Sequence, residues 1–365
     1  MQAVKSLLRP AVSRQESSRR TERPAKSGSR SKAESPRPRE AARVLPVRAR
    51  TSPRLPSLAP VPEDATDADI EPGQRLRVAT YNIHKGVLRD FTGLRRVARI
   101  HELRARLHEL DSDLIFLQEV QGQHQRNARR FAHWPSESQE LFLSRSPTTR
   151  QAFETAYGRN ANYLHGHHGN ALLSRFPIVG LENRDVSDHA LEKRGVLHCR
   201  IAFGERQVHC FVVHFGLFAA SRERQLDALL AWIDAEVASD QPLIVAGDFN
   251  DWRNALSERL CSSAGLTEVF DVVHPRPESL QKAAYFVRDR LNSVGAVAPV
   301  PMSLLPRMVR TARTWPALAP WFRMDRIYQR GFRVNTARVL RGLEWARLSD
   351  HSPLIADLEL PDADG

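Results

Sequence analysis

The stretch from Pro242 to Asn250, PLIVAGDFN, sets two chemically capable side chains at the end of an apolar run. Leu243 to Ala246 are consecutive apolar residues, typical of a buried strand and too short for a helix. Asp248 and Asn250 follow with one residue between them, so in an extended chain both side chains point the same way. A carboxylate can orient or deprotonate a water molecule, and a carboxamide can donate to a phosphate oxygen. The alternative is an Asx turn that only ends a core strand.

Polar side chains also stand at the ends of other apolar runs. They are Asn82, Glu119, His214, Asp325, Asp350 and His351. Oxygen ligands such as those of Glu119, Asp350 and Asn82 suit a hard cation such as Mg²⁺. A histidine paired with a carboxylate can transfer protons and contact phosphate. A lone histidine at a strand end is more often structural, but several such ends gathered at one sheet edge predict a catalytic site.

The elements that must position these side chains follow from the spacing of apolar residues. Strands are predicted at 76–86, 113–120, 169–175, 195–203, 207–215, 242–247, 322–332 and 353–360, with another ending at Leu340. The two runs around Gly204 predict a hairpin. Amphipathic helices are predicted from Leu94 to Leu110 and from Arg222 to Val237. This order of strands and helices favours a mixed α/β fold.

Two further segments carry suggestive side chains without a regular pattern. His165, His167 and His168 invite a metal-site interpretation, but their spacing matches no common ligand pattern, so an irregular cleft wall is the alternative. The stretch 294–322 is apolar but interrupted by prolines and arginines, and it carries Trp315 and Trp321. We expect a lid, a substrate-contacting loop or an interfacial patch there, or else an ordinary packed loop.

The 365 residues carry a formal net charge of +12, most of it in the first segment. Met1 to Pro62 holds 15 Lys and Arg against 4 Asp and Glu, a surplus of 11. Residues 1–73 are rich in Ser, Pro and Arg, which predicts a disordered tail. Such a tail can hold nucleic acid or an anionic membrane weakly. A merely solvated tail, an over-extended start and a transit peptide are the alternatives.

Hydropathy and cysteine usage point to the compartment. No run of about 18 apolar residues occurs, so no transmembrane helix is predicted. The cysteines are Cys199, Cys210 and Cys261, an odd number without close pairs. This pattern argues against a disulfide framework and for a reducing compartment, so we expect a cytoplasmic protein.

Seven short motifs occur in the order T-Y-N-I-H-K-G, L-Q-E-V, G-N-A-L-L-S-R, V-V-H-F, G-D-F-N, M-D-R-I-Y and S-D-H-S-P. Over roughly residues 74–360 this ordered set closely resembles the endonuclease/exonuclease/phosphatase superfamily, and its start resembles a bacterial branch of small metal-dependent hydrolases. The resemblance implies an α/β (α+β) fold of the deoxyribonuclease I type, and we expect a monomer. That fold is a four-layer αββα sandwich of two mixed β-sheets, here over residues 74–361.

The resemblance also implies a metal and a water activator. Glu119 and Asn82 would hold a Mg²⁺ or Mn²⁺ ion, with Asp350 beside it. Asp248 would orient or deprotonate the attacking water. Within this family the general base is assigned to the aspartate in some accounts and to the histidine, here His351, in others, and the sequence leaves both open.

Phosphate contacts are implied for Asn250, for His351 and for Asn170 in GNALLSR, with Arg175 as a weaker contact. His214 would stabilise charge or protonate the leaving group.

Asp325 would orient His351, and the alternative is that Asp325 pairs with a neighbouring arginine, Arg323 or Arg326. Two departures stand out. His214 has no clear carboxylate partner, with Asp185, Asp188 and Glu192 as candidates, and no helical DNA-gripping insertion is visible.

The expected reaction is metal-dependent hydrolysis of a phosphodiester or phosphomonoester by in-line attack of an activated water. Three alternatives stay open. The first is a DNA nuclease, against which the mild charge of the segment after the tail argues weakly. The second is a phospholipid or inositol-phosphate hydrolase, which the tryptophan-bearing stretch favours weakly. The third is a non-catalytic binding module on the same fold.

Overall fold

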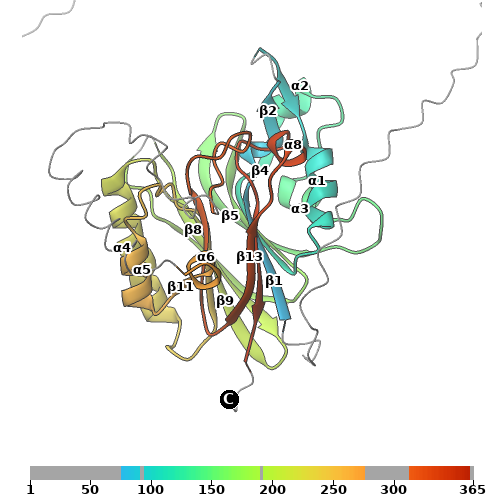
Figure 1. Cartoon of the computed structure of the whole chain (residues 1–365). Helices are drawn as coiled ribbons and strands as arrows, with labels where there is room; N and C mark the ends of the chain where they lie inside the picture. Colours follow the sequence, from blue (N-terminus) through green and yellow to red (C-terminus); the bar gives the residue numbers. More distant parts are fainter. Residues whose placement is uncertain (1–74, 91–93, 190–191, 276–311, 362–365) are drawn as a thin grey trace, which may run out of the picture. The chain divides into compact units, whose positions relative to one another are not determined.

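The computed structural model describes residues 75–90, 94–189, 192–275 and 312–361 (Figure 1). The predicted tail at 1–73 and the first part of the tryptophan-bearing stretch, 294–311, lie outside the described residues. The described chain forms two six-stranded sheets and one two-stranded ribbon. No helix in these ranges is both long and apolar enough to cross a membrane. The three cysteines are all free thiols.

The first sheet contains both chain-terminal strands of the described region. Its strands lie in the order β13 (Arg333–Val339), β14 (Leu354–Glu359), β1 (Arg75–Asn82), β4 (Leu114–His124), β6 (Gly166–Ser174) and β5 (Glu154–Tyr163). β1 and β4 run parallel because α1 (Ile100–Glu109) connects them as a crossover. All other neighbours are antiparallel, so the sheet is mixed.

The second sheet has the same plan. Its strands lie in the order β11 (Thr267–Glu268), β12 (Asp325–Arg330), β10 (Leu243–Asp248), β9 (Arg206–His214), β8 (Gly195–Phe203) and β7 (Ile178–Asp185). β9 and β10 run parallel, and α4 (Ala219–Glu236) is their crossover. The other pairs are antiparallel, and β8 and β9 form the predicted hairpin.

Three clusters of buried apolar side chains hold the layers together. One lies between the sheets and combines Val78 and Phe116 of the first sheet with Val212 and Ile244 of the second. α6 (Val269–Val273) also packs into it. Burial of this surface from water supplies the main driving force for joining the sheets.

The two outer faces are covered by helices (Figure 1). α1, α3 (Gln139–Ser144) and α8 (Leu343–Ala346) pack on the first sheet, and α4 and α5 (Ser257–Ala264) pack on the second. The layers therefore run helix, sheet, sheet, helix. This confirms the predicted αββα sandwich.

Local structure differs from the predictions at the start of α1. Arg96–Ala98 form β3, paired antiparallel with β2 (Val87–Arg89), and α1 begins only at Ile100. The predicted helix from Leu94 was therefore wrong over its first turn. Leu94 is 84% exposed, so its place in a helical spacing was coincidental.

The histidine stretch was also misassigned. His167 and His168 lie in β6 rather than in an irregular segment, and as consecutive strand residues they face opposite sides. The edge strand β7 was not predicted, because only one of its faces is covered and its sequence is largely polar. Helix α4 begins three residues earlier than predicted, at Ala219.

A chain that begins at Gln74 should fold as the full chain does. Every strand of both sheets and all three apolar clusters come from residues 75–361. We expect a cooperative thermal transition within a few degrees of the full chain's melting temperature, measured by circular dichroism. A shortened chain without a cooperative transition would show that residues 1–73 are needed for folding.

Candidate active site

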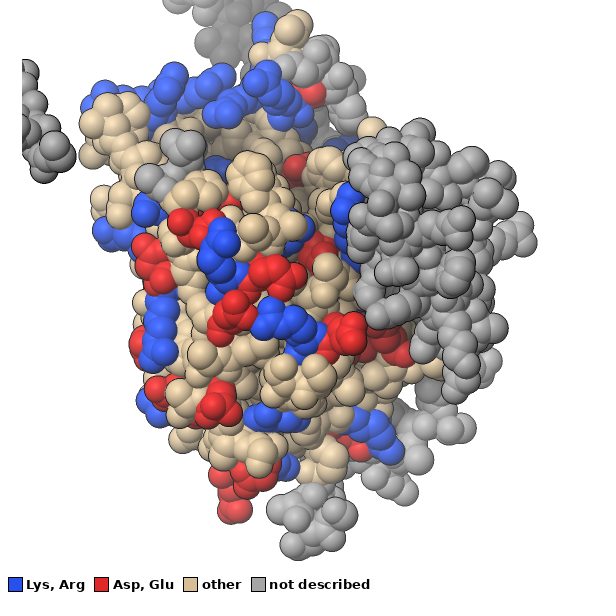
Figure 2. All heavy atoms as spheres, turned by 90° about the vertical axis from the view of Figure 1, so that its left-hand side faces the viewer, with Lys and Arg blue, Asp and Glu red and all other residues tan. Residues whose placement is uncertain are grey.

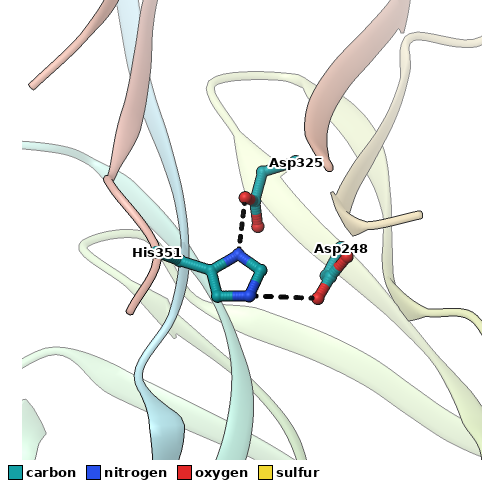
Figure 3. A group of neighbouring side chains, drawn as sticks. All are labelled: Asp248, Asp325 and His351. Atoms are coloured by element: carbon teal, nitrogen blue, oxygen red, sulfur yellow. Dashed lines mark hydrogen bonds and ion pairs between the residues drawn. The ribbon is translucent and has the colours of Figure 1, made fainter. Parts of the chain in front are cut away.

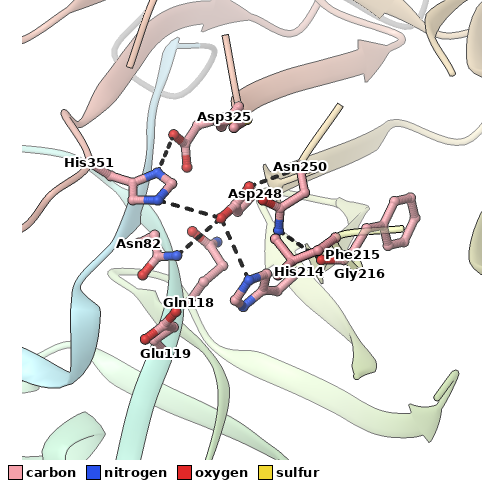
Figure 4. A network of polar contacts seen from close by, with 12 residues as sticks. Asn82, Gln118, Glu119, His214, Phe215, Gly216, Asp248, Asn250, Asp325 and His351 are labelled. Carbon is pink, nitrogen blue, oxygen red and sulfur yellow. Dashed lines mark hydrogen bonds and ion pairs between the residues drawn. The ribbon is translucent and has the colours of Figure 1, made fainter. Parts of the chain in front are cut away.

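Strand register brings the predicted polar strand ends to one edge of both sheets. In the second sheet Asp248 on β10 is paired with His214 on β9 and with Asp325 on β12. In the first sheet Asn82 at the end of β1 is paired with Gln118 on β4. A hydrogen bond of 3.1 Å from Asn82 Nδ2 to Asp248 Oδ2 joins the two groups (Figure 4). The site therefore spans the junction of the sheets.

Asp248 lies at the centre of this network and is 1% exposed. Its Oδ2 atom lies 3.6 Å from Nε2 of His214 and 3.7 Å from Nε2 of His351 (Figure 4). Burial raises the pKa of Asp248 to about 6, although the charge of His351 opposes this rise. The carboxylate is thus an acceptor whose proton affinity lies near neutral pH.

Asp248 and Asn250 form the Asx turn that was considered as an alternative, and both residues nevertheless belong to the candidate site. The backbone N–H of Asn250 donates to Asp248 Oδ1 at 2.9 Å, which is the Asx turn. Its side-chain Nδ2 donates to the carbonyl of Phe215 at 2.9 Å, and its φ is +49°. The turn thereby fixes the orientation of the Asp248 carboxylate, and the phosphate-binding role of Asn250 stays a prediction.

His351 and Asp325 form a buried pair (Figure 3). Nδ1 of His351 lies 2.8 Å from Oδ2 of Asp325, which is fully buried. Burial alone would lower the pKa of His351, but the carboxylates of Asp325 and Asp248 outweigh it and raise that pKa to about 10. His351 is therefore a cation at neutral pH.

The structure does not pair Asp325 with Arg323 or Arg326, which was the alternative to its pairing with His351. Arg323 pairs with Glu268 and Asp271, and Arg326 donates to the carbonyl of Asp251. Oδ1 of Asp325 is buried and has no partner among the described residues.

His214 differs from His351 in charge. Burial lowers its pKa well below the ordinary value, and nearby Arg194 adds to this effect. The three carboxylates proposed as its partner face elsewhere: Asp188 binds Ser221 and Arg224, Glu192 binds Arg194, and Asp185 accepts from the backbone of Ser187. Asp248 is the carboxylate that His214 faces. The site thus combines one neutral and one protonated imidazole around a single carboxylate.

Glu119 sits in a strained bulge of β4. Pairing with β6 shifts register between Leu117 and Val120, and Glu119 has a left-handed φ of +57°. Its carboxylate lies 2.5 Å from Nζ of Lys85. Burial would raise the pKa of Glu119, but the charge of Lys85 outweighs it and lowers the pKa to about 2. Glu119 is therefore ionised at any physiological pH.

The donor set beside Glu119 fits a hard cation. Asn82 and Gln118 are cross-strand partners and Glu119 follows Gln118, so a carboxylate and two amide side chains come from adjoining positions of β1 and β4 (Figure 4). Oε1 of Gln118 is buried without a partner among the described residues. Oxygen donors of this kind are those that Mg²⁺ and Mn²⁺ prefer. The ammonium of Lys85 pairs with Glu119 in this structure, so a metal ion bound to that carboxylate would take its place.

A second set of potential metal ligands consists of Asp248, Asp325 and His351, whose ligand atoms lie within 4.8 Å of one another. A cation is disfavoured there because Asp325 already binds a protonated His351. This set is better suited to holding a proton. The three histidines at 165–168 form no such group among the described residues.

Several site residues were missed from the sequence. Gln118 precedes Glu119 in L-Q-E-V, and the bulge keeps both near the site. His84 Nδ1 lies 3.0 Å from Oδ1 of Asp350, whose other oxygen accepts from Trp315 Nε1 at 3.2 Å. Burial would raise the pKa of Asp350, but the bond from His84 holds it below its usual range.

Ser349 was also missed. Its hydroxyl donates to the carbonyl of Asn82 at 2.6 Å and accepts from the backbone N–H of His351 at 3.2 Å. It thereby ties the segment before β14 to the end of β1. The signal for Ser349, His84 and Lys85 was their place inside the motifs T-Y-N-I-H-K-G and S-D-H-S-P.

The two other predicted phosphate contacts, Asn170 and Arg175, bond to different partners. Nδ2 of Asn170 donates to the carbonyls of Gly195 at 2.9 Å and Val212 at 3.2 Å, so its amide group ties the two sheets together. Arg175 lies at the other end of β4, where it pairs with Asp111 and Asp113. Their roles toward phosphate stay predictions.

Replacing Asn170 by Ala separates the two roles. Loss of two buried hydrogen bonds should lower the free energy of unfolding by about 2 kcal/mol. The matched control is Asn183→Ala, because Asn183 Nδ2 makes one exposed bond to the carbonyl of Arg159, and its loss should be smaller. Urea unfolding measures both. A stable Asn170→Ala protein that cannot bind substrate would instead support the phosphate role.

Comparisons with known proteins cover most of the chain after its first 78 residues. A family model described as "Endonuclease/Exonuclease/phosphatase family" matches residues 79–351. The protein named "Uncharacterized protein YbhP" of Escherichia coli K12 is 38% identical over 286 residues, which is 78% of this chain and 96% of that protein. A protein of the same name from Shigella flexneri matches equally.

Solved structures share the fold at low identity. An endonuclease/exonuclease/phosphatase from Beutenbergia cavernae has a TM-score of 0.53 at 19% identity, over 80% of this chain and 72% of that one. Humanized D. rerio TDP2 has a TM-score of 0.51 at 16% identity, over 78% and 99%. The human Nocturnin catalytic domain, with bound sulfate, has a TM-score of 0.50 at 19% identity, over 79% and 94%.

Proposed function

The chain belongs to the endonuclease/exonuclease/phosphatase family, and on this basis we propose that it is a metal-dependent phosphoesterase. It hydrolyses a phosphodiester or phosphomonoester by in-line attack of a water molecule. The observation that carries this proposal is the buried Asp248 carboxylate between a neutral His214 and a protonated His351. In this arrangement the carboxylate of Asp248 can remove a proton from water, and the protonated His351 can deliver one to the leaving group.

The metal proposed is Mg²⁺ or Mn²⁺, held by Glu119 with Asn82 and Gln118 and with Asp350 nearby. When bound, it neutralises charge that develops on the phosphate. The side chains supply the rest. Asn82 is doubly engaged, since its Nδ2 holds Asp248 and its Oδ1 accepts from the backbone of His84 at 3.1 Å. This fixes the distance between the metal ligands and the proposed base.

Asp248 is the proposed general base. Its pKa of about 6 leaves it ionised at neutral pH yet able to accept a proton. Asn82 and the Asn250 backbone hold the carboxylate, so it is oriented before substrate arrives. As the water oxygen bonds to phosphorus, its proton passes to Asp248.

His351 and His214 act on the phosphate and the leaving group. Their Nε2 atoms lie beyond hydrogen-bond distance of Asp248, at 3.7 and 3.6 Å, so each is able to bond a substrate oxygen. His351 carries the proton that the leaving oxygen takes as its bond to phosphorus breaks. Asp325 binds Nδ1 and therefore directs Nε2 toward the substrate.

The direct test is a substrate panel with the full chain. Mg²⁺, Mn²⁺ or excess EDTA is combined with bis(p-nitrophenyl) phosphate, single-stranded and plasmid DNA, phospholipid vesicles and inositol phosphates. We expect hydrolysis of at least one ester with metal and none with EDTA. A protein that binds one of these ligands but hydrolyses none would be the non-catalytic module instead.

Replacing Glu119 by Gln keeps the side-chain shape but removes the ligand charge. We expect the metal-dependent rate to fall by at least about 100-fold, because a metal supplies several kcal/mol of transition-state stabilisation. Mn²⁺ binding, followed by electron paramagnetic resonance, should weaken in parallel while the melting temperature is kept. The control Glu102→Gln removes a surface carboxylate on α1 and should change neither quantity. Unchanged Mn²⁺ binding in the Glu119 variant would exclude it as the ligand.

Asp325→Asn tests the histidine pair. Removing the charge should lower the pKa of His351 from about 10, so the loss of activity at alkaline pH should move to lower pH. His351→Ala should cost about as much rate as Asp325→Asn, and the double variant should be little worse, because the two residues act as one unit. Nuclear magnetic resonance titration of His351 in metal-free protein measures the pKa directly.

The same variants have a stability signature. The folded-state pKa of His351 lies above its ordinary value of 6.5, so the pair stabilises the fold most below that pH and loses this contribution as pH rises toward 10. Melting temperatures of parent and variants should therefore converge at alkaline pH. Additive rate effects with an unshifted pH profile would mean that Asp325 serves the sheet edge alone.

A further inference from the structure

An open cavity of about 550 Å³ lies beside the candidate active site. It is bounded by the β2–β3 ribbon, by α2 (Gln125–Arg130) and by the end of β5 and start of β6. His84 and Lys85 also line it, and these residues contact Asp350 and Glu119 of the candidate active site. The cavity and the proposed metal position are therefore adjacent.

The walls of the cavity are strongly basic. Arg89 and Arg96 are cross-strand partners in the β2–β3 ribbon on one side. Arg126 and Arg130 stand one helical turn apart on α2 on the other side. No carboxylate of the described residues lines the cavity. Figure 2 shows Lys and Arg gathered along the upper edge of the molecule, the end at which β2 and α2 lie in Figure 1.

Neutral side chains in the cavity, like the arginines, present hydrogen-bond donors. The backbone N–H of Asn127 donates to Nδ1 of His124 at 3.0 Å, so the ring proton of neutral His124 is on Nε2. Nε2 of Gln121 donates to the hydroxyl oxygen of Tyr163 at 2.9 Å, which leaves the hydroxyl hydrogen for another acceptor. Gln121 Oε1 is itself taken by Nδ2 of Asn127 at 2.9 Å.

These basic and hydrogen-bond-donating walls suit an anion that accepts several hydrogen bonds. Arginine forks bind phosphate through paired N–H groups. The Tyr163 ring lies 5.4 Å from that of His124 and 5.8 Å from that of His168, which provides an aromatic wall for the sugar or ring that carries a phosphate.

We propose that this cavity binds a second phosphate group of the substrate, so that the enzyme selects phosphate esters carrying another phosphate next to the scissile one. The proposal rests on the phosphoesterase function proposed above and adds its substrate class. The second phosphate belongs either to the next unit of a nucleic acid strand or to a small multiply phosphorylated molecule. Both sources present the same chemistry to the arginines.

Matched substrates test the selection. Thymidine dinucleotide is compared with its 5′-phosphorylated form, and inositol monophosphate with inositol bisphosphate. For the source that is used, kcat/KM should be at least about tenfold higher for the ester with the extra phosphate, the size of one charge-assisted hydrogen bond. Equal values in both pairs would overturn the proposal. The pair that shows the preference identifies the source.

Variants locate the preference in the cavity. Arg126→Gln and Arg96→Gln should each lower the ratio of the two kcat/KM values about tenfold, mainly through KM. The matched control is Arg129→Gln, because Arg129 is an exposed arginine of the same helix that does not line the cavity. A preference that survives both cavity substitutions, or that falls equally in the control, would overturn the proposal.

A binding measurement separates this proposal from the proposed function. Inorganic pyrophosphate is titrated calorimetrically into metal-free full chain and the same three variants. We expect binding that weakens about tenfold in Arg126→Gln and Arg96→Gln but not in Arg129→Gln. If no ester is hydrolysed yet this pattern appears, the phosphoesterase function fails and the anion cavity stands. If hydrolysis occurs but binding is insensitive to both cavity substitutions, the cavity proposal fails alone.

Discussion

The buried hydrogen bond between Asn82 and Asp248 is the contact on which the rest of the site depends. Each residue ends a strand of a different sheet, so their bond fixes how the two sheets meet at this edge. An unpaired carboxylate at 1% exposure would be costly, and Asn82 together with the Asn250 backbone satisfies it. The same contacts that make Asp248 tolerable in the core also orient it. Stability and chemistry therefore draw on the same hydrogen bonds.

Backbone strain is concentrated around this edge. Left-handed φ angles occur at His84, Lys85, Glu119 and Asn250, none of which is glycine. Such conformations cost free energy and persist only where the surroundings enforce them. Here β1 and β10 are buried and paired up to the strained residues, so the two sheets hold these conformations in place. The result is that Lys85, in the turn after β1, and Glu119, in the bulge of β4, project toward each other.

The surroundings of the site are unequal on its two sides. Loops of the first sheet contribute the arginine-lined cavity, whereas loops of the second contribute aromatic rings. Trp315 stacks on Phe322 at 5.9 Å, and Trp252 meets Phe322 edge-on at 5.6 Å. Trp315 also donates to Asp350, so this aromatic group is anchored to the candidate active site. A substrate with an anionic part and an apolar or ring-bearing part would match the basic cavity on one side of the site and the aromatic rings on the other.

By itself the sequence determined the layers of the fold and the identity of the central side chains. Apolar runs of strand length and the hairpin around Gly204 predicted the strands and a mixed α/β fold, and these signals are local, because burial demands apolar residues in a repeating pattern wherever an element faces the core. The αββα sandwich and the roles of Asp248, His351 and Glu119 were implied by the family resemblance of the seven ordered motifs.

Only the tertiary structure decided which partners those side chains have and what charge they carry. Three features depend on residues that are far apart in sequence. They are the contact of His214 with Asp248, the opposite protonation states of His214 and His351, and the cavity between the β2–β3 ribbon and α2. The pKa of a side chain depends on its burial and on charges a few ångström away, and the spacing of residues along the sequence gives neither. The exposed β2–β3 ribbon and the polar edge strand β7 were not predicted, because elements with little buried surface do not need a repeating pattern of apolar residues.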